Sequence, residues 1–69
     1  MKIYAMRYVV FDCFDAPEAE FATAEQAKYY VRRNYTKADY EHYEITIRGK
    51  ITKDDGEEIW VGNLDIKAY

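Results

Sequence analysis

The chain has 69 residues and a formal net charge of −3 at pH 7, and its composition is 49% hydrophobic and 17% aromatic. So apolar a composition excludes a disordered chain, and the length predicts a single domain over residues 1–69, near the lower limit of what one core can stabilise. Cys13 is the only cysteine, which excludes an intrachain disulfide and predicts a reducing, cytoplasmic location. No apolar run is long enough to span a membrane.

The first predicted element is a strand over residues 2–11, where Ile, Val and aromatic residues favour an extended backbone. Both of its faces are apolar, so we expect a central strand of a sheet. One face holds Tyr4, Met6, Tyr8 and Val10, and the other holds Ile3, Ala5, Val9 and Phe11, interrupted by Arg7. Residues 12–20 follow as a predicted acidic loop that turns at Pro17.

A helix is predicted to begin after Thr23, because Thr23 and Gln26 have the spacing of a capping box. It should end at about residues 34–35. At 100° per residue, the face that we expect to be buried holds Ala24, Ala27, Val31 and Tyr35. Tyr29 lies on the opposite face, and we expect its side chain to be in water.

Residues 42–52 alternate regularly between apolar and polar side chains, which predicts a strand with one buried face. The apolar side holds Tyr43, Ile45, Ile47 and Ile51. Residues 53–57 then predict a hairpin turn in which Gly56 takes a positive φ.

The turn type decides how the next strand, residues 57–61, is aligned. A two-residue turn at Asp55 and Gly56 would place Trp60 beside Ile51 on the core face. A type I turn with Gly56 as a bulge would instead bury Ile59 and Val61 and turn Trp60 outward, and the sequence favours this second register. A further strand over residues 64–68 is left open.

These elements predict an α+β fold of order β-α-β-β(-β), an antiparallel sheet of three to four strands with one helix packed on one face. Its second face would be uncovered and would expose Ile3, Val9 and Phe11. Exposed apolar patches usually mark partners, such as a second copy in a homodimer or a host protein. Alternatively, residues 12–22 fold across this face with Phe14 and Phe21.

The sequence offers few residues that could form a catalytic or metal site. Cys13 and His42 are the only candidates for a nucleophile and its base, with Glu44 to orient the imidazole, and the alternation predicts that His42 points away from the core. The acidic segments lack the ligand spacing of a calcium loop, and no glycine-rich phosphate loop is present. We therefore predict no enzyme, no cofactor and no metal.

Charge is segregated along the chain. Residues 28–53 hold seven Lys and Arg against three acids, whereas residues 1–27 and 54–69 have net charges of −3 and −4. Five of the eight tyrosines lie in the basic middle. Three of them are assigned to the core, namely Tyr30, Tyr35 and Tyr43. The candidate partner-binding residues are Tyr29, Arg32, Arg33, Lys37 and Tyr40 in the basic region, and Asp12, Asp15, Glu18, Glu20, Asp54 and Asp55 in the acidic segments.

Residues 21–30 and 54–60, a capped helix start and an acidic hairpin, give the chain a style that resembles small phage-encoded and mobile-element-encoded inhibitors, including anti-CRISPR proteins. The resemblance implies a single α+β domain that occupies a host complex without catalysis.

The leading hypothesis is therefore a non-enzymatic inhibitor or adaptor that binds a host protein or nucleoprotein complex, either through acidic segments that imitate nucleic-acid phosphates or through the basic tyrosine-rich surface. The alternative is a small RNA- or DNA-binding module that stacks bases on tyrosines and pairs phosphates with arginines.

Overall fold

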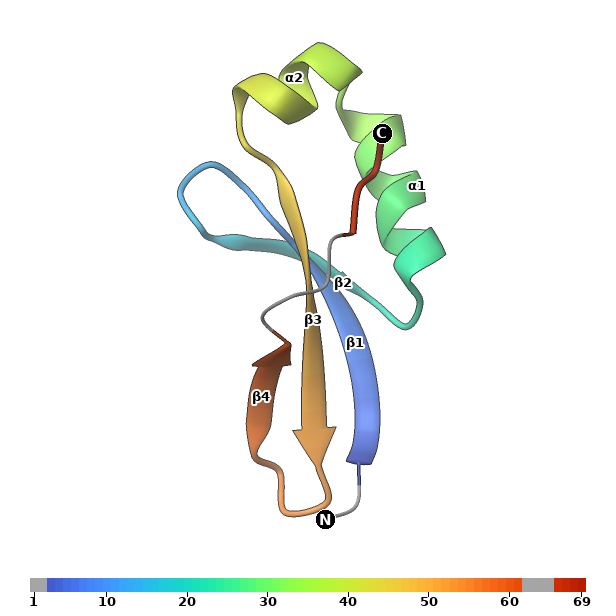
Figure 1. Cartoon of the computed structure of the whole chain (residues 1–69), viewed down its shortest axis with the longest axis vertical. Coiled ribbons are helices and arrows are strands. Elements are labelled where there is room, and N and C mark those ends of the chain that lie inside the picture. The colour runs from blue at the N-terminus through green and yellow to red at the C-terminus, as the bar shows by residue number, and fades with distance from the viewer. Residues whose placement is uncertain (1–2, 62–65) are drawn as a thin grey trace.

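The computed structural model describes residues 3–61 and 66–69 and shows one open antiparallel sheet with two short helices (Figure 1). In chain order the described elements are β1 (Ile3–Phe11), β2 (Pro17–Phe21), α1 (Ala24–Asn34), α2 (Lys37–His42), β3 (Thr46–Lys53) and β4 (Glu58–Val61). The strand order is β2-β1-β3-β4, which confirms the α+β class and the central position of the first strand.

The predicted acidic loop contains a strand. β2 pairs antiparallel with β1, and Glu20 lies opposite Val9 while Ala19 lies opposite Val10. Glu and Ala have low strand propensity, so the pairing with β1 overrides the local preference here. The register shifts between Val10 and Phe11, and Pro17 begins the strand, as is usual at the edge of a sheet.

The sequence analysis also missed α2 and began the second strand too early. Thr36 caps α2, because its hydroxyl oxygen accepts a hydrogen bond from the Asp39 amide at 3.1 Å. His42 therefore ends a helix, and β3 begins only at Thr46. The open question of a strand over residues 64–68 falls partly outside the described residues, and residues 66–68 belong to no strand.

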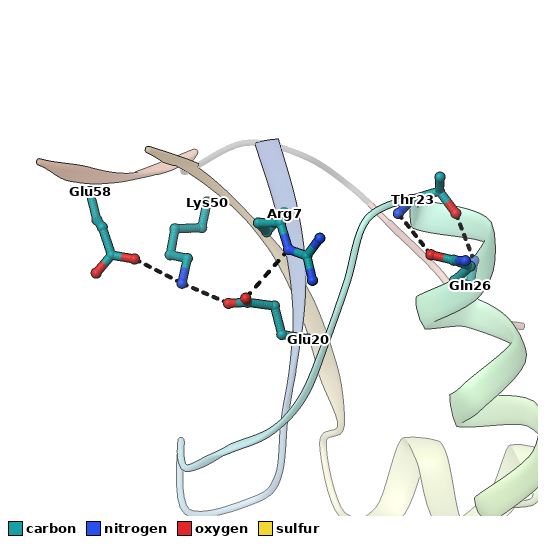
Figure 2. A network of polar contacts seen from close by, with 6 residues as sticks. All are labelled: Arg7, Glu20, Thr23, Gln26, Lys50 and Glu58. Atoms are coloured by element: carbon teal, nitrogen blue, oxygen red, sulfur yellow. Dashed lines mark hydrogen bonds and ion pairs between the residues drawn. The ribbon is translucent and has the colours of Figure 1, made fainter. Parts of the chain in front are cut away.

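The helix α1 begins and ends as expected. Thr23 and Gln26 form both hydrogen bonds of the capping box, at 3.2 and 3.3 Å, and Figure 2 shows this pair. Ala27 and Val31 are fully buried and pack in the main core with Val10 and Ile47. Alternation on β1 and β3 and the 3.6-residue period of α1 thus bury the faces that the sequence indicated.

The hairpin between β3 and β4 has the bulged turn. The Gly56 amide donates to the Lys53 carbonyl at 3.0 Å, the Lys53 amide donates to the Glu57 carbonyl at 2.8 Å, and Gly56 has a φ of 87°. Ile59 is consequently opposite Ile51, as this turn requires. Ile59 is nevertheless 38% exposed, so its expected burial is wrong, because α1 packs mainly on β1 and β2 and leaves β4 uncovered.

The second face of the sheet is covered by long charged side chains. Val9 and Phe11 are only 3% and 6% exposed, so the expected apolar patch is wrong for these two residues, and the side chain of Ile3 lies outside the described part. The Arg48 guanidinium lies 4.4 Å from the centre of the Phe11 ring, and Trp60 packs edge-on against the same ring. The alternative prediction, that residues 12–22 fold across this face, is also wrong, because residues 17–21 form strand β2 of the sheet itself.

An ion-pair ladder crosses this second face (Figure 2). Glu20 accepts from Arg7 at 3.4 Å and pairs with Lys50 at 2.6 Å, and Lys50 also pairs with Glu58 at 2.8 Å. The ladder joins all four strands, because these residues come from β1, β2, β3 and β4. The aliphatic parts of such side chains can cover apolar surface while their charges stay in water.

The last four residues lie against α1. Ala68 is fully buried, and its carbonyl accepts a hydrogen bond from Arg32 Nε at 2.5 Å. The Tyr69 hydroxyl donates to the carbonyl oxygen of Tyr35, at the end of the helix. Within residues 3–61 and 66–69, neither helix is long and apolar enough to cross a membrane.

Candidate functional site

A surface hollow with a volume of about 440 Å³ lies between the end of β2 and the outward side of α1. We call it the α1 groove. Its lining residues are Phe21, Glu25, Gln26, Tyr29, Tyr30 and Arg33. Phe21 and Tyr30 form its inner wall, with ring centres 5.4 Å apart, and Tyr29 is 61% exposed, as the sequence predicted. An apolar hollow with a few polar groups at its rim suits a side chain of a partner.

Arg33 supplies the positive charge of the groove. Its Nη1 donates to the Tyr29 hydroxyl at 3.0 Å, and its guanidinium lies 6.0 Å from the centre of the Tyr29 ring. The two residues are one helical turn apart, which places them side by side on α1. In the described part of the chain, Arg33 has no carboxylate partner, whereas Arg7, Arg48 and Lys50 are all paired. Donors of Arg33 therefore remain for an external anion.

Glu18 holds the inner wall of the groove in place. Its carboxylate accepts a hydrogen bond from the Tyr30 hydroxyl at 2.9 Å and two contacts from the Tyr35 hydroxyl at 2.6 and 2.8 Å. The hydrogen bond to Glu18 and burial raise the pKa of Tyr35 well above its usual range, and burial together with Glu18 raises the pKa of Tyr30. Both hydroxyls therefore keep their protons, and donate to Glu18, to a higher pH than an ordinary tyrosine would. The assignment of Tyr30 and Tyr35 to the core agrees with their packing against it.

The five basic and aromatic residues singled out from the sequence do not form one surface. Arg32 is occupied by the Ala68 carbonyl. Tyr40 packs against the core, its ring centre lies 5.5 Å from that of Tyr69, and its hydroxyl accepts from the Ala68 amide at 3.4 Å. Lys37 begins α2 and is exposed. Only Tyr29 and Arg33 lie together in the α1 groove.

The first acidic segment is engaged within the fold. Asp12 accepts two backbone amides of its own turn, and Asp15 pairs with Arg48 at 2.6 Å. Glu18 binds tyrosines and Glu20 belongs to the ion-pair ladder. Of the second acidic segment, Asp54 is exposed, and Asp55 Oδ1 accepts the Glu57 amide inside the hairpin turn.

The two candidate catalytic residues lie on different elements. Cys13 is exposed in the turn after β1, and His42 ends α2, with its ring edge-on to Tyr43. Among the described residues, no hydrogen bond joins the Cys13 thiol to His42, and no three His, Cys, Asp or Glu side chains gather as metal ligands. This arrangement offers no assembled nucleophile and base.

Sequence reasoning missed two aromatic residues of the α1 groove and misplaced two others outside it. Phe21 was placed in a loop, and Tyr30 was regarded only as core, although both line the groove. Phe14 is 86% exposed, although it was a candidate cover for the sheet. Tyr43 was assigned to the core and is 45% exposed, because it follows α2 and does not lie in β3. The pairing of β2 with β1 was the missing signal, since it places Phe21 beside α1.

Comparison of the chain with protein-family models, with curated proteins and with solved structures finds no match. The functional argument therefore rests on the geometry of the α1 groove.

Proposed function

We propose that this protein is a non-enzymatic interaction protein, an inhibitor or adaptor, that acts in the cytoplasm by binding a segment of a host protein in the α1 groove. The observation that carries the proposal is an apolar hollow whose rim holds the exposed Tyr29 ring and the guanidinium of Arg33, which lacks a carboxylate partner in the described part of the chain. The partner segment that fits has an aromatic side chain next to a carboxylate.

The physical basis is a division of roles between the inner wall and the rim. The rings of Phe21 and Tyr30 offer apolar contact area, and edge-to-face or offset ring pairs add to simple burial. The hydrogen bond between Arg33 and Tyr29 restricts both side chains before binding, which reduces the side-chain entropy lost on binding. Tyr and Arg are the residues most often found to dominate binding energy in protein interfaces.

A protein partner is favoured over the alternative, a nucleic acid. Single-strand binding needs several cations along one groove with rings between them. Arg32 and Tyr40 are committed to residues 68–69, which leaves Arg33 as the one cation lining the α1 groove. The net charge of −3 further weakens a binding mode that depends on phosphate contacts.

The engaged state of Asp12, Glu18 and Glu20 also favours the groove over the acidic segments as the contact surface. The Glu20 carboxylate, which already pairs with Lys50 and Arg7, attracts an external cation less strongly. Replacing these acids would disturb the fold itself, so they are poor probes of partner binding.

The proposal is tested by titrating the ¹⁵N-labelled protein with the capped dipeptide N-acetyl-Phe-Asp-amide. We expect shifts at the amides of Phe21, Tyr29, Tyr30 and Arg33. Arg33→Ala should weaken binding about tenfold, because a hydrogen bond to a charged group contributes roughly 1.5 kcal/mol. Lys37→Ala is the matched control, since Lys37 is an exposed cation outside the groove, and it should leave the affinity unchanged.

Two outcomes would contradict the proposal. If Arg33→Ala leaves the dipeptide affinity unchanged, or if the shifted amides lie outside the groove, the α1 groove is not the binding site. A single-stranded oligonucleotide that shifts the same amides, with an affinity that falls steeply with salt, would favour the nucleic-acid module.

A further inference from the structure

The turn between β1 and β2 presents a phenylalanine to solvent. Phe14 is 86% exposed, more than any other large apolar residue described. A ring this exposed contributes almost nothing to folding by burial. Single exposed apolar residues are common, so exposure alone assigns no role.

Four hydrogen bonds and one ion pair hold the turn around Phe14. The Asp12 carboxylate accepts the amides of Phe14 at 2.8 Å and of Ala16 at 3.0 Å. Two backbone hydrogen bonds at 3.1 Å, from Asp12 to Ala16 and from Asp15 to Asp12, close the same turn. Asp15, with a φ of 58°, is fixed from outside by Arg48. The Phe14 ring is therefore presented on an ordered backbone and needs little further ordering to bind.

We propose that Phe14 and Asp15 of one copy occupy the α1 groove of a second copy. This inference rests on the proposed function, because it supplies a partner of the class that the groove is argued to accept. The groove, at about 440 Å³, is larger than a phenylalanine side chain, and its walls are aromatic. Asp15 follows Phe14 directly and meets the requirement for a carboxylate beside the ring.

The charges of the two surfaces match. Asp15 uses its Oδ1 for Arg48, and its side chain is 75% exposed, so its second oxygen remains available. Arg33 has no carboxylate partner among the residues that the structure describes. A charge-assisted hydrogen bond between them would orient the ring in the groove.

A copy cannot fill its own groove in this way. Phe14 precedes β2 and Phe21 ends it, and the five residues of β2 alone span about 13 Å. The contact is therefore between different surfaces of two copies. Each copy keeps one free turn and one free groove, so the association continues into chains unless it closes into a ring.

Self-association of this kind would mask the groove. A host segment with the same chemistry would compete with Phe14 of a neighbouring copy, and dilution would free the groove. The contact surface is small, so we expect weak association that grows with concentration over the micromolar to millimolar range, as for the low end of protein interfaces.

The test is sedimentation velocity of the whole chain over this concentration range, with two complementary variants. Phe14→Ala removes the ring and keeps the groove, whereas Arg33→Glu spoils the groove and keeps the ring. Each variant alone should remain a monomer. Their equimolar mixture should form a dimer and nothing larger, because one intact groove can meet one intact Phe14. Ile59→Ala, which trims a different exposed apolar residue, should associate like the wild type.

Several results would overturn the inference. These are a monomeric wild type at millimolar concentration, variants that associate normally, and a mixture that stays monomeric. The circular dichroism spectrum of each variant checks that it is folded. If the dipeptide still binds the groove while the wild type stays monomeric, this inference fails and the proposed function stands. If the dipeptide does not bind, and association requires Phe14 but is unchanged by Arg33→Glu, the α1 groove is not a binding site and both proposals are wrong.

Discussion

Both oxygens of the Glu18 carboxylate accept from the Tyr35 hydroxyl, at 2.6 and 2.8 Å. Glu18 belongs to the edge strand β2, and Tyr35 is the residue that ends α1, so this pair ties one end of the helix to the edge of the sheet. Tyr30 joins the same carboxylate at 2.9 Å. The inner wall of the α1 groove therefore depends on an acid that does not line the groove.

Replacing this acid should loosen the attachment of α1. We expect Glu18→Gln to lower the free energy of unfolding by about 1–2 kcal/mol, because hydrogen bonds to a charged acceptor are exchanged for weaker neutral ones. Urea denaturation measures this change. Glu25→Gln is the control, since Glu25 makes only an exposed pair with Lys28 on α1, and it should cost less than about 0.5 kcal/mol. Equal effects of the two substitutions would contradict the role of Glu18.

The stability should fall in alkaline solution. The pKa of Tyr35 is raised in the fold by its hydrogen bond to Glu18 and by burial, and the pKa of Tyr30 and of Lys50 is also raised. A raised pKa means that the folded state holds its proton longer, so this stabilisation is complete below the ordinary tyrosine pKa of about 10 and is lost as the pH rises above it. Urea midpoints between pH 8 and 11 should decline in the wild type, and less steeply in Glu18→Gln. A flat profile in the wild type would exclude the coupling.

A smaller loss is expected in acid. The hydrogen bond from Lys50 lowers the pKa of Glu20, burial opposes this shift, and Arg7 adds to it. A lowered pKa makes the stabilisation present above the ordinary glutamate value of 4.5 and lost as the pH falls below it. Glu20→Gln should therefore flatten the dependence of stability on pH between about 5 and 3. An NMR titration that gives Glu20 an ordinary pKa would contradict the ion-pair ladder.

The hairpin offers a test of backbone conformation alone. Gly56 has a φ of 87°, and a Cβ added there would meet no atom within 4 Å. Gly56→Ala should therefore destabilise by about 1 kcal/mol through the left-handed backbone and not through a clash. Gly56→Asn is the matched variant and should cost less, since Asn tolerates this region. Thermal unfolding that ranks Ala above Asn in stability would show that the turn changes its type.

Much of the fold follows from local patterns. The capping box of Thr23 and Gln26, the buried stripe of Ala27 and Val31, and the bulged turn at Gly56 are all encoded within a few residues, and each is present in the structure. Such signals are readable because a helix cap, a helical period and a tight turn need no distant partner.

The missed features depend on residues far apart in the sequence. β2 is a strand because it pairs with β1, since Glu and Ala would not extend the chain by themselves. The burial of Phe11 depends on Arg48 and Trp60, which come from β3 and β4. The α1 groove depends on both kinds of signal. Its outward residue Tyr29 was predicted from the helical period, whereas Phe21 enters the groove only through the pairing of β2.

The contacts of residues 68 and 69 with α1 can form only late in the synthesis of the chain. The Tyr35 carbonyl accepts a hydrogen bond from the Tyr69 hydroxyl, and Arg32 donates one to the Ala68 carbonyl. Each contact joins residues more than thirty positions apart. Because translation starts at the N-terminus, α1 is synthesised before these partners. The carbonyl of Tyr35 and the side chain of Arg32 therefore gain these partners only after residues 66–69 have been synthesised.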